Sequence, residues 1–422
     1  MSLTGFEIAT DEPPVAESGV WLACIGCGVT LAPFDDVVYT CPTCDGLLEV
    51  RYRDLAPLDS FIGADSDGVW RFSEVLPLKR EISLDEGDTP LYDLPEVAES
   101  IGVASLQVKH EGMNPTGSFK DRGMTVGVGV ANHLGIDRLV CASTGNTSAS
   151  LAAYGGRAGK ETLVLLPAGK VAAGKLAQAS LHGARILEVD GNFDACLDLV
   201  QRLAEDGEAY LLNSVNPFRL EGQKTIAFEI LLSCFERDGV LPDRICLPVG
   251  NAGNTAALYK AFRELVTAGS VDPASIPKLT AVQAAGAAPF VKAVEAGSDA
   301  VDRWDTVETT ATAIRIGYPV NAPKALPGIV ATDGTAIAVE DSEISEAQRE
   351  LAEAGIGVEP ASAASLAGLK RLRREGVVDA SERVVCLTTG HLLKDPDAAA
   401  NAGRRPEAVP DDYEAILQHL QE

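Results

Sequence analysis

Basic residues and long apolar runs are both scarce in this sequence of 422 residues. Aspartate and glutamate outnumber lysine and arginine by 61 to 35, which gives a formal net charge of −26 at pH 7 and a pI near 4.6. A charge of that sign repels nucleic-acid phosphates and anionic lipid headgroups. No apolar run reaches the roughly 18–20 residues that a membrane helix needs. The sequence therefore predicts neither a nucleic-acid-binding protein nor a membrane protein.

The sequence also begins without the features of a secretory signal, because its opening residues form neither a basic segment nor an apolar one. Nine cysteines in such a chain favour a reducing compartment, where paired cysteines are more often metal ligands than disulfides. We therefore expect a cytoplasmic protein. The acidic excess suits the high-salt cytoplasm of a halophile, where screening relieves self-repulsion, and an acidic protein of an ordinary cytoplasm is the alternative.

Aromatic residues make up only 5% of the chain, but hydrophobic residues make up 46%, which is enough for a sizeable core. From residue 76 onward, short apolar runs alternate with alanine-rich stretches of helical character. Such runs are typical of strands buried on both faces of a parallel sheet. The runs are SLQVKH, DRLVCA, ETLVLLP, ARILEVD, AYLLN, RICLPVG, KLTAVQA, TAIAVE and RVVCLTT. The pattern predicts a layered α/β protein with two open lobes.

Two of the helices between these runs have clear boundaries. Amphipathic patterns predict helices over residues 254–269 and 342–355. Ser342 is expected to open the second helix and Gly355 to close it, because serine caps helix starts and glycine tolerates the left-handed backbone at helix ends.

The chain divides into four parts on composition. Residues 1–18 read as a loose leader, and residues 19–75 as a cysteine ribbon with its linker. Residues 76–396 form the core, whose small lobe is expected over about 117–213 and whose large lobe is the remainder. Residues 397–422 form a C-terminal tail.

Four of the nine cysteines lie close together as Cys24-x2-Cys27 and Cys41-x2-Cys44. Two such pairs, separated by thirteen residues, can bring four thiolates into the tetrahedron that Zn2+ prefers. Four cysteine ligands would close the coordination shell, so the expected zinc is structural and not catalytic. Free thiols without a metal are the alternative.

One lysine, Lys120, stands at the expected start of a helix, in the segment NPTGSFKDRG. A lysine near the positive end of a helix dipole tends to have a lowered pKa, and its free amine is a better nucleophile. Taken alone, the segment favours an ordinary surface lysine.

Three loops with small or hydroxyl side chains follow expected strands. Loop 250–254 precedes a helix start, whose backbone N–H groups can cradle a phosphate. Loop 143–147 offers hydroxyls and an amide for an anion such as a carboxylate, and loop 389–390 ends the last strand. Open α/β sheets bind ligands at this edge. A lysine, a phosphate cradle and a carboxylate cradle together suggest pyridoxal phosphate carrying an amino acid.

Five motifs in this order, NPTGSFKDRG, STGNTSAS, NSVNPFRLEGQKT, PVGNAGN and TTGHLLKD, are far more specific together than any one of them. With them the core resembles the fold-type II pyridoxal-phosphate enzymes (tryptophan synthase β-like) and, within these, the threonine synthases. The cysteine ribbon resembles the N-terminal extension of some archaeal and bacterial threonine synthases. The resemblance implies conversion of O-phospho-L-homoserine and water into L-threonine and phosphate with pyridoxal 5'-phosphate as cofactor. We also expect a homodimer.

The resemblance also implies roles for individual residues. Lys120 would link to the cofactor and later move protons, Asn146 would hydrogen-bond its phenolic oxygen, and Thr389 would face its pyridine nitrogen. Arg219 would clamp the substrate's own phosphate. The cofactor phosphate would be held by Gly250, Asn251, Ala252, Gly253 and Asn254, the substrate carboxylate by Ser143, Thr144 and Thr147, and the substrate phosphate by Ser214, Arg219 and Asn251.

Two positions depart from the family pattern at the substrate end: Leu392 stands where glycine is expected, and Tyr318 where asparagine is usual. Cysteate synthase, which starts from phosphoserine, is therefore the main alternative, together with other fold-type II lyases acting on phosphorylated or hydroxy amino acids. A non-catalytic zinc-ribbon protein that binds an amino acid or the cofactor is a further alternative, which the presence of Lys120 disfavours.

Overall fold

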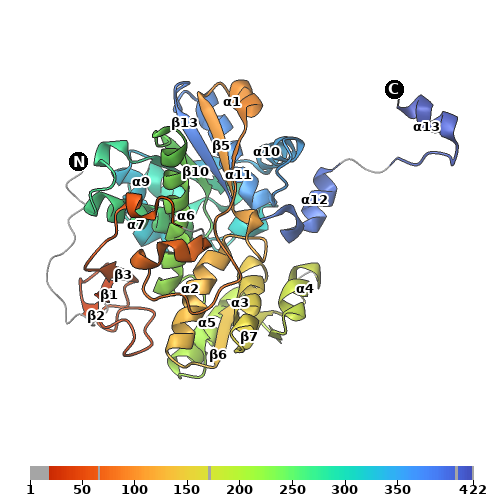
Figure 1. Ribbon diagram of the computed structural model, residues 1–422. Coiled ribbons are helices and arrows are strands. Elements are labelled where there is room, and N and C mark those ends of the chain that lie inside the picture. Colours follow the sequence, from red (N-terminus) through yellow and green to blue (C-terminus); the bar gives the residue numbers. More distant parts are fainter. Residues whose placement is uncertain (1–18, 65–66, 170–172, 404–406, 421–422) are drawn as a thin grey trace.

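The computed structural model describes residues 19–64, 67–169, 173–403 and 407–420, so the leader expected over residues 1–18 lies outside the described part. Two mainly parallel sheets form the body, and a small antiparallel ribbon lies against it (Figure 1). Helices cover the faces of both parallel sheets. This arrangement confirms the predicted α/β class with two lobes and an N-terminal ribbon.

The larger sheet has six strands. They are β4 (Leu91–Asp93), β5 (Ser105–His110), β10 (Arg244–Pro248), β11 (Lys278–Ala284), β12 (Thr335–Val339) and β13 (Arg383–Thr388). Their order is β12-β11-β10-β13-β5-β4, and all neighbours run parallel except β4, which pairs antiparallel with β5. Every strand but β4 is one of the predicted apolar runs. The edge strand β4 was not predicted, because its three residues are largely exposed and form no apolar run.

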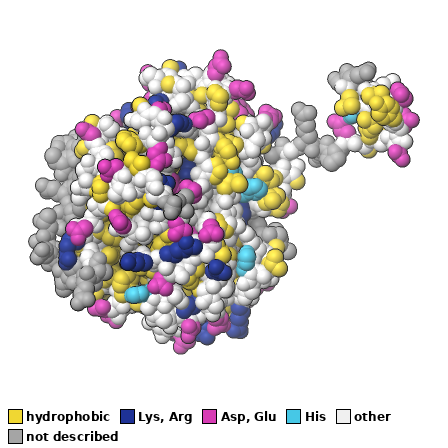
Figure 2. Space-filling view, in the orientation of Figure 1, with side chains coloured by type: hydrophobic (Ala, Val, Ile, Leu, Met, Phe, Trp, Pro, Cys, Tyr) yellow, Lys and Arg dark blue, Asp and Glu magenta, His cyan; other side chains and the backbone are white. Residues whose placement is uncertain are grey.

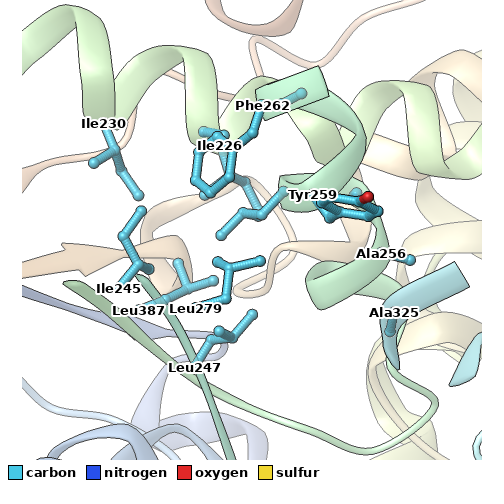
Figure 3. Close-up of a cluster of buried hydrophobic side chains, with 14 of the residues drawn as sticks. Ile226, Ile230, Ile245, Leu247, Ala256, Tyr259, Phe262, Leu279, Ala325 and Leu387 are labelled. Carbon is cyan, nitrogen blue, oxygen red and sulfur yellow. The ribbon is translucent and has the colours of Figure 1, made fainter. Parts of the chain in front are cut away.

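Helices on both faces bury the apolar side chains of the larger sheet. One face is covered by α6 (Pro217–Asp238), α7 (Gly253–Thr267), α8 (Pro289–Glu295) and α9 (Ala322–Ala331), and the other by α1 (Pro95–Ile101), α10 (Asp341–Glu353) and α11 (Pro360–Arg374). Figure 3 shows side chains of α6, α7 and α9 gathered around those of β10, β11 and β13. Burial from both sides explains why the strands read as continuous apolar runs.

The smaller sheet lies within residues 117–213, the span expected for the small lobe. Its strands are β6 (Arg138–Ala142), β7 (Glu161–Pro167), β8 (Arg185–Val189) and β9 (Tyr210–Leu211), all parallel, in the order β8-β7-β6-β9. One face packs against α2 (Lys120–His133), α3 (Asn146–Arg157) and α4 (Ala173–Leu181), and the other against α5 (Phe193–Glu205).

Helix α10 begins differently from the prediction. Ser342 does not cap it, because the helix already begins at Asp341 with Glu340 as its cap. Glu343 accepts a hydrogen bond from the backbone N–H of Glu340 at 2.9 Å, and the Glu340 side chain accepts one from the first turn in return. Two carboxylates therefore do the capping expected of serine. Gly355 follows the helix end with a φ of 84°, as predicted.

The N-terminal ribbon packs against both lobes: its apolar side chains share a core with α2 and the smaller sheet, and its polar groups bond to α6 and α9 of the larger one. It consists of β1 (Val20–Cys24), β2 (Thr30–Leu31) and β3 (Leu48–Tyr52), paired antiparallel in the order β2-β1-β3, and is followed by the 3-10 helices η2 (Leu58–Phe61) and η3 (Gly68–Val75). The Lys324 ammonium of α9 donates to the Leu48 carbonyl at 2.6 Å. The Tyr52 hydroxyl donates to the Glu221 carboxylate of α6 at 2.6 Å. These buried polar contacts join the ribbon to the core.

The C-terminal residues form α12 (Pro396–Ala402) and α13 (Tyr413–His419), and α13 lies apart from the body in Figure 1. Figure 2 shows Asp and Glu side chains scattered over the visible face, with Lys and Arg among them. The acidic excess is therefore not gathered into one patch on that face. In the described part of the chain, no helix combines the length and apolar character needed to cross a membrane.

Candidate active site

A cavity of about 1420 Å3 lies between the two parallel sheets, where the loops after β6, β9, β10 and β13 meet. Ligands bind at this edge in open α/β sheets, because the carboxyl ends of the strands and the starts of the following helices converge there. The cavity is lined by all the residues predicted to bind cofactor or substrate: Lys120, Ser143, Thr144, Asn146, Thr147, Ser214, Arg219, Gly250, Asn251, Ala252, Gly253, Asn254 and Thr389. Residues from distant parts of the sequence thus share one space.

Lys120 is the first residue of α2 and lines the cavity. Burial and the nearby positive charge of Arg219 lower the pKa of Lys120 to about 7, while the negative charge of Glu359 acts in the opposite direction. The Lys120 ammonium nitrogen lies 4.1 Å from the centre of the Phe119 ring. An amine with a pKa near 7 is partly uncharged at neutral pH, so it can act as a nucleophile or as a base.

Two buried residues after Lys120 hold its segment in place. The Asp121 carboxylate accepts hydrogen bonds from the hydroxyl and backbone N–H of Thr116 and from the Ser150 hydroxyl, at 2.6–2.7 Å. Arg122 is fully buried and forms ion pairs of 2.6 Å with two glutamates. Neither side chain lines the cavity, so both serve the position of Lys120 through packing.

Loop 250–254 forms a tight turn between β10 and α7. Ala252 has a φ of 58° and a ψ of 15°, in the left-handed region, which costs about 1–2 kcal/mol for a residue other than glycine. Helix α7 starts at Gly253, and the first N–H groups of a helix lack partners within it. Since loop and helix start both line the cavity, they offer backbone donors and the positive end of a helix dipole to an anion.

Arg219, in the first turns of α6, is a buried cation that lines the cavity. Its side chain is 2% exposed, and its guanidinium donates to the Leu212 carbonyl at 3.1 Å. Within the described residues, its Nε has no hydrogen-bond partner and no carboxylate forms an ion pair with it. Burial lowers the pKa of Arg219 to about 10. A buried charge normally has a counter-ion, so this one indicates a place for an anionic ligand.

Loop 143–147 leads from β6 into α3 and supplies a second helix start. The Ser143 hydroxyl accepts a hydrogen bond from the Gly145 N–H at 3.2 Å. Asn146 is the first residue of α3, and its side-chain amide donates to both oxygens of Glu359, at 3.0 and 3.2 Å. The hydroxyls and free N–H groups of this loop can receive a carboxylate.

Thr389 follows β13, and its loop is fixed by a serine of α11. The Ser362 hydroxyl oxygen accepts hydrogen bonds from the N–H groups of Thr389 and Gly390 at 2.9 and 2.8 Å. The hydroxyl oxygens of Thr389 and Ser362 are 3.0 Å apart. The Thr389 hydroxyl is therefore held at the cavity wall, where it can donate to or accept from a ring nitrogen.

Five buried polar residues that line the cavity were not predicted: Gln223, Asn321, Gln348, Glu359 and Asp395. The Asn321 side-chain amide donates to the Ser214 carbonyl at 3.0 Å, so it holds the backbone of a residue predicted to bind the substrate phosphate. Its own backbone N–H donates to the Asn251 carbonyl at 3.0 Å. Gln223 follows Arg219 by one helical turn, a spacing that could have suggested a shared face. Asn321 and Glu359 carry no local sequence signal.

The two departures from the family pattern lie in different places. Tyr318 lines the cavity and is 45% exposed, with the Arg303 guanidinium 4.9 Å from the centre of its ring. Leu392 is not among the lining residues and packs against Gly357, where a Cβ atom would come within 2.0 Å of it. Of the two, Tyr318 is the one able to contact a ligand.

These residues fit pyridoxal phosphate. A phosphate ester needs backbone donors, which the start of α7 offers, and an aldehyde needs an uncharged amine, which Lys120 can supply. Asn146 and Thr389 offer polar partners for the ring at the cavity wall. Arg219 supplies a further buried positive charge for an anion.

The four cysteines of the ribbon form a compact cluster. The sulfur atoms of Cys24, Cys27, Cys41 and Cys44 all lie within 4.8 Å of one another. Zinc–sulfur bonds of about 2.3 Å in a tetrahedron place the sulfurs roughly 3.8 Å apart, so the cluster has the size of a metal site. Backbone N–H groups approach the sulfur of Cys24 at 3.4 and 3.5 Å and that of Cys41 at 3.4 Å. Such donors stabilise thiolates, which are the form that binds metal.

Comparison with known proteins agrees with this site. A family model described as pyridoxal-phosphate dependent enzyme matches residues 82–390. The threonine synthase of Methanosarcina acetivorans is 54% identical over 407 residues, which cover 94% of this chain and 98% of the relative. The threonine synthase of Methanocaldococcus jannaschii is 53% identical over 408 residues, covering 94% and 99%.

Solved structures extend the comparison to the fold. Diaminopropionate ammonia lyase from Escherichia coli matches with a TM-score of 0.66 at 16% identity, over 83% of this chain and 93% of that one. At such identity the likeness concerns the fold alone. It agrees with the two-lobed α/β fold.

Proposed function

The chain belongs to the pyridoxal-phosphate dependent enzymes and, among them, to the threonine synthases, and from this premise we propose that it converts O-phospho-L-homoserine and water into L-threonine and inorganic phosphate. The proposed cofactor is pyridoxal 5'-phosphate. This reaction needs one site that holds an amino acid and two phosphate groups, one of the cofactor and one of the substrate.

The observation that carries the proposal is the buried Arg219 beside a separate phosphate cradle. Loop 250–254 with the start of α7 suffices for the cofactor phosphate. Arg219 then remains in the same cavity as a guanidinium for which the described residues provide no counter-ion. A lyase acting on an uncharged hydroxy amino acid needs no second phosphate site, whereas a phosphorylated substrate does. Arg219 and Ser214 are the proposed ligands of the substrate phosphate, with Asn251 beside them.

Lys120 is the proposed base of the reaction. When bound, pyridoxal phosphate supplies an aldehyde for the amine of the substrate and a ring that stabilises negative charge at its α carbon. With a pKa of about 7, Lys120 can take the proton from the α carbon at neutral pH and then assist removal of a proton from the β carbon. Phosphate leaves from the γ carbon, one proton is delivered to the γ carbon and one returns to the α carbon, and water adds its hydroxyl at the β carbon, so that L-threonine and inorganic phosphate result.

The remaining residues are proposed to orient the substrate and the ring. The hydroxyls of Ser143, Thr144 and Thr147, with the N–H groups at the start of α3, suit the substrate carboxylate. Asn146 is proposed to bond the phenolic oxygen of the ring and Thr389 to face its pyridine nitrogen. A hydroxyl is far less acidic than a carboxylic acid, so Thr389 would leave that nitrogen largely unprotonated.

We further propose that the cysteine cluster holds a structural Zn2+ ion. Four cysteine ligands leave no open coordination position, so the ion would take no part in catalysis. The support is the size of the cluster and the N–H donors at its sulfurs. We also propose that the enzyme is a homodimer and lies in the cytoplasm. A measurement of its molar mass in solution tests the dimer.

The experiment that tests the function offers O-phosphohomoserine and O-phosphoserine separately to the cofactor-loaded protein. We expect threonine and phosphate in equal amounts from the first and negligible turnover of the second. Lys120→Ala, assayed alongside, should be inactive. Consumption of O-phosphoserine in preference to O-phosphohomoserine would refute the substrate assignment and favour the cysteate synthase alternative.

A further inference from the structure

Glu359 lies in the wall of the cavity and interacts with two residues of the proposed machinery. It precedes α11, is 4% exposed, and lines the same cavity as Lys120 and Asn146. The proposed chemistry gives this glutamate no role. A buried carboxylate is costly unless it is paired, so its position needs a reason.

Helix capping does not supply that reason. Glu359 is the N-cap residue of α11, yet its side chain makes no capping hydrogen bond. Its two carboxylate oxygens instead accept hydrogen bonds from the side-chain amide nitrogen of Asn146, at 3.0 and 3.2 Å. At Gly390 a Cβ atom would come within 2.4 Å of the nearer Glu359 oxygen, so glycine there leaves room for the carboxylate. The Asn146 amide and the space at Gly390 thus keep the Glu359 carboxylate in the cavity wall.

The charged groups around Glu359 come from several elements. Lys120 of α2 and Lys394 of η8 (Leu392–Lys394) attract its negative charge, and Asp395 repels it. Burial raises the pKa of Glu359 above its usual range, and these two lysines oppose that effect. Burial and the positive charge of Lys394 also lower the pKa of His391. Lys120 in turn is repelled by Arg219.

We propose that Glu359 is a positioning residue of the active site: its carboxylate fixes the Asn146 amide and supplies a buried negative charge that favours the protonated form of the Lys120 nitrogen. An amide nitrogen carries two hydrogens, so Asn146 can hold Glu359 with one and keep the other for the phenolic oxygen of the cofactor. This inference rests on the proposed function for the role of Asn146. The charge effect on Lys120 needs no cofactor.

The test measures the protonation of Lys120 in the full chain without added cofactor. The rate at which acetic anhydride labels Lys120, followed by peptide mass spectrometry from pH 5 to 10, gives the pKa of its amine. Glu359→Gln removes the charge and keeps the size of the side chain. We expect this variant to lower the pKa of Lys120 by about one unit, a tenfold change in its acid dissociation constant.

Two variants control the measurement. Asp397→Asn removes a carboxylate from an exposed part of the cavity wall and should leave the pKa of Lys120 within a few tenths of the wild-type value. Glu359→Asp keeps the charge and should behave like the wild type, which separates charge from packing. An unchanged pKa of Lys120 in Glu359→Gln, or an equal shift in Glu359→Asp, would overturn the inference.

A second readout separates this inference from the proposed function. With pyridoxal phosphate added, the link to Lys120 should absorb at roughly 410 nm, a general property of such C=N bonds. Loss of this band at high pH should begin about one pH unit earlier in Glu359→Gln, because the protonated nitrogen loses its counter-charge. A wild-type protein that forms no band refutes the proposed function. A band that titrates identically in both proteins refutes the role of Glu359 alone.

Discussion

Replacement of Arg219 by methionine should separate stability from activity. Arg219 is buried and lacks an acidic partner in the described part of the chain, so its charge costs free energy in the folded state. Its pKa falls from 12.5 to about 10, which corresponds to about 3 kcal/mol against the charged form. Arg219→Met removes that cost and loses one hydrogen bond to a carbonyl, worth about 1 kcal/mol. The free energy of unfolding should stay equal or rise by up to about 2 kcal/mol.

Activity should respond in the opposite direction. Two charge-assisted hydrogen bonds from a guanidinium to a phosphate contribute roughly 1.5–3 kcal/mol each. Their loss from Arg219→Met should lower kcat/KM for O-phosphohomoserine by about 10²- to 10⁴-fold. Affinity for pyridoxal phosphate should change little, because the proposed cofactor cradle is loop 250–254. Arg219→Lys keeps a positive charge but loses the forked donors of the guanidinium, so its kcat/KM should lie between those of the wild type and Arg219→Met.

The matched control is Arg244, an arginine equally buried but paired. Its guanidinium donates to both oxygens of Glu382, at 2.6 and 3.1 Å, and to the Thr280 hydroxyl at 2.8 Å. Arg244→Met removes the ion pair of that carboxylate, which keeps only the Asp379 N–H as a hydrogen-bond donor at 3.3 Å, and should lower the free energy of unfolding by about 3 kcal/mol. Urea unfolding and phosphate-release kinetics measure both effects. If Arg219→Met destabilises the protein as Arg244→Met does, or keeps its activity, the reasoning about an anion site is wrong.

Four further outcomes follow from the structure. Without cofactor, Lys120→Met should be more stable than the wild type at pH 7, and unfolding curves should show this difference shrinking towards pH 10. The unfolded chain keeps the Lys120 proton up to pH 10.5 whereas the folded chain releases it near pH 7, so the stability of the wild type rises with pH between these values. A difference that stays constant with pH would contradict the lowered pKa. Elemental analysis should find one zinc per chain, absent in Cys41→Ser, whose thermal midpoint should be lower; an equal midpoint would contradict a structural metal. Raising KCl from 0.1 M to about 2 M should increase the free energy of unfolding by screening the net charge of −26, and equal stability would contradict this. Gly390→Ala should displace the Glu359 carboxylate and lower stability by about 1–3 kcal/mol in calorimetry, whereas a neutral effect would contradict the close contact.

Much of the fold could be predicted from the sequence because burial leaves a strong pattern. All nine apolar runs are strands of the two parallel sheets, and most of them are covered on both faces, although the edge strand β8 has no buried residue. The edge strand β4 carries no such pattern, since edge strands are short and partly solvated. Ser342 was the wrong cap for α10, because Glu340 and Glu343 satisfy the helix start between them. Local chemistry alone did not distinguish these capping residues.

Some residues of the site could likewise be predicted from the sequence, and others could not. The place of Lys120 and of loop 250–254 at the cavity could be predicted because each belongs to a local motif at the start of a helix. Glu359 could not, because its partner Asn146 is 213 residues away in the sequence. A glutamate before a proline at a helix start predicts a cap, and only the tertiary contact shows a cavity residue. Asn321 was missed for the same reason, since it acts through the carbonyls of two distant loops.

Lys120 is the amine proposed to bind the cofactor, and its labelling is the most direct test of the proposed function. Protein incubated with pyridoxal phosphate, reduced with borohydride and digested should carry the cofactor mass on the peptide that contains Lys120, at about one per chain. O-phosphohomoserine added before the reduction should lower that yield, because the substrate amine takes the place of Lys120. Cofactor found on another lysine, or on none, would contradict the account.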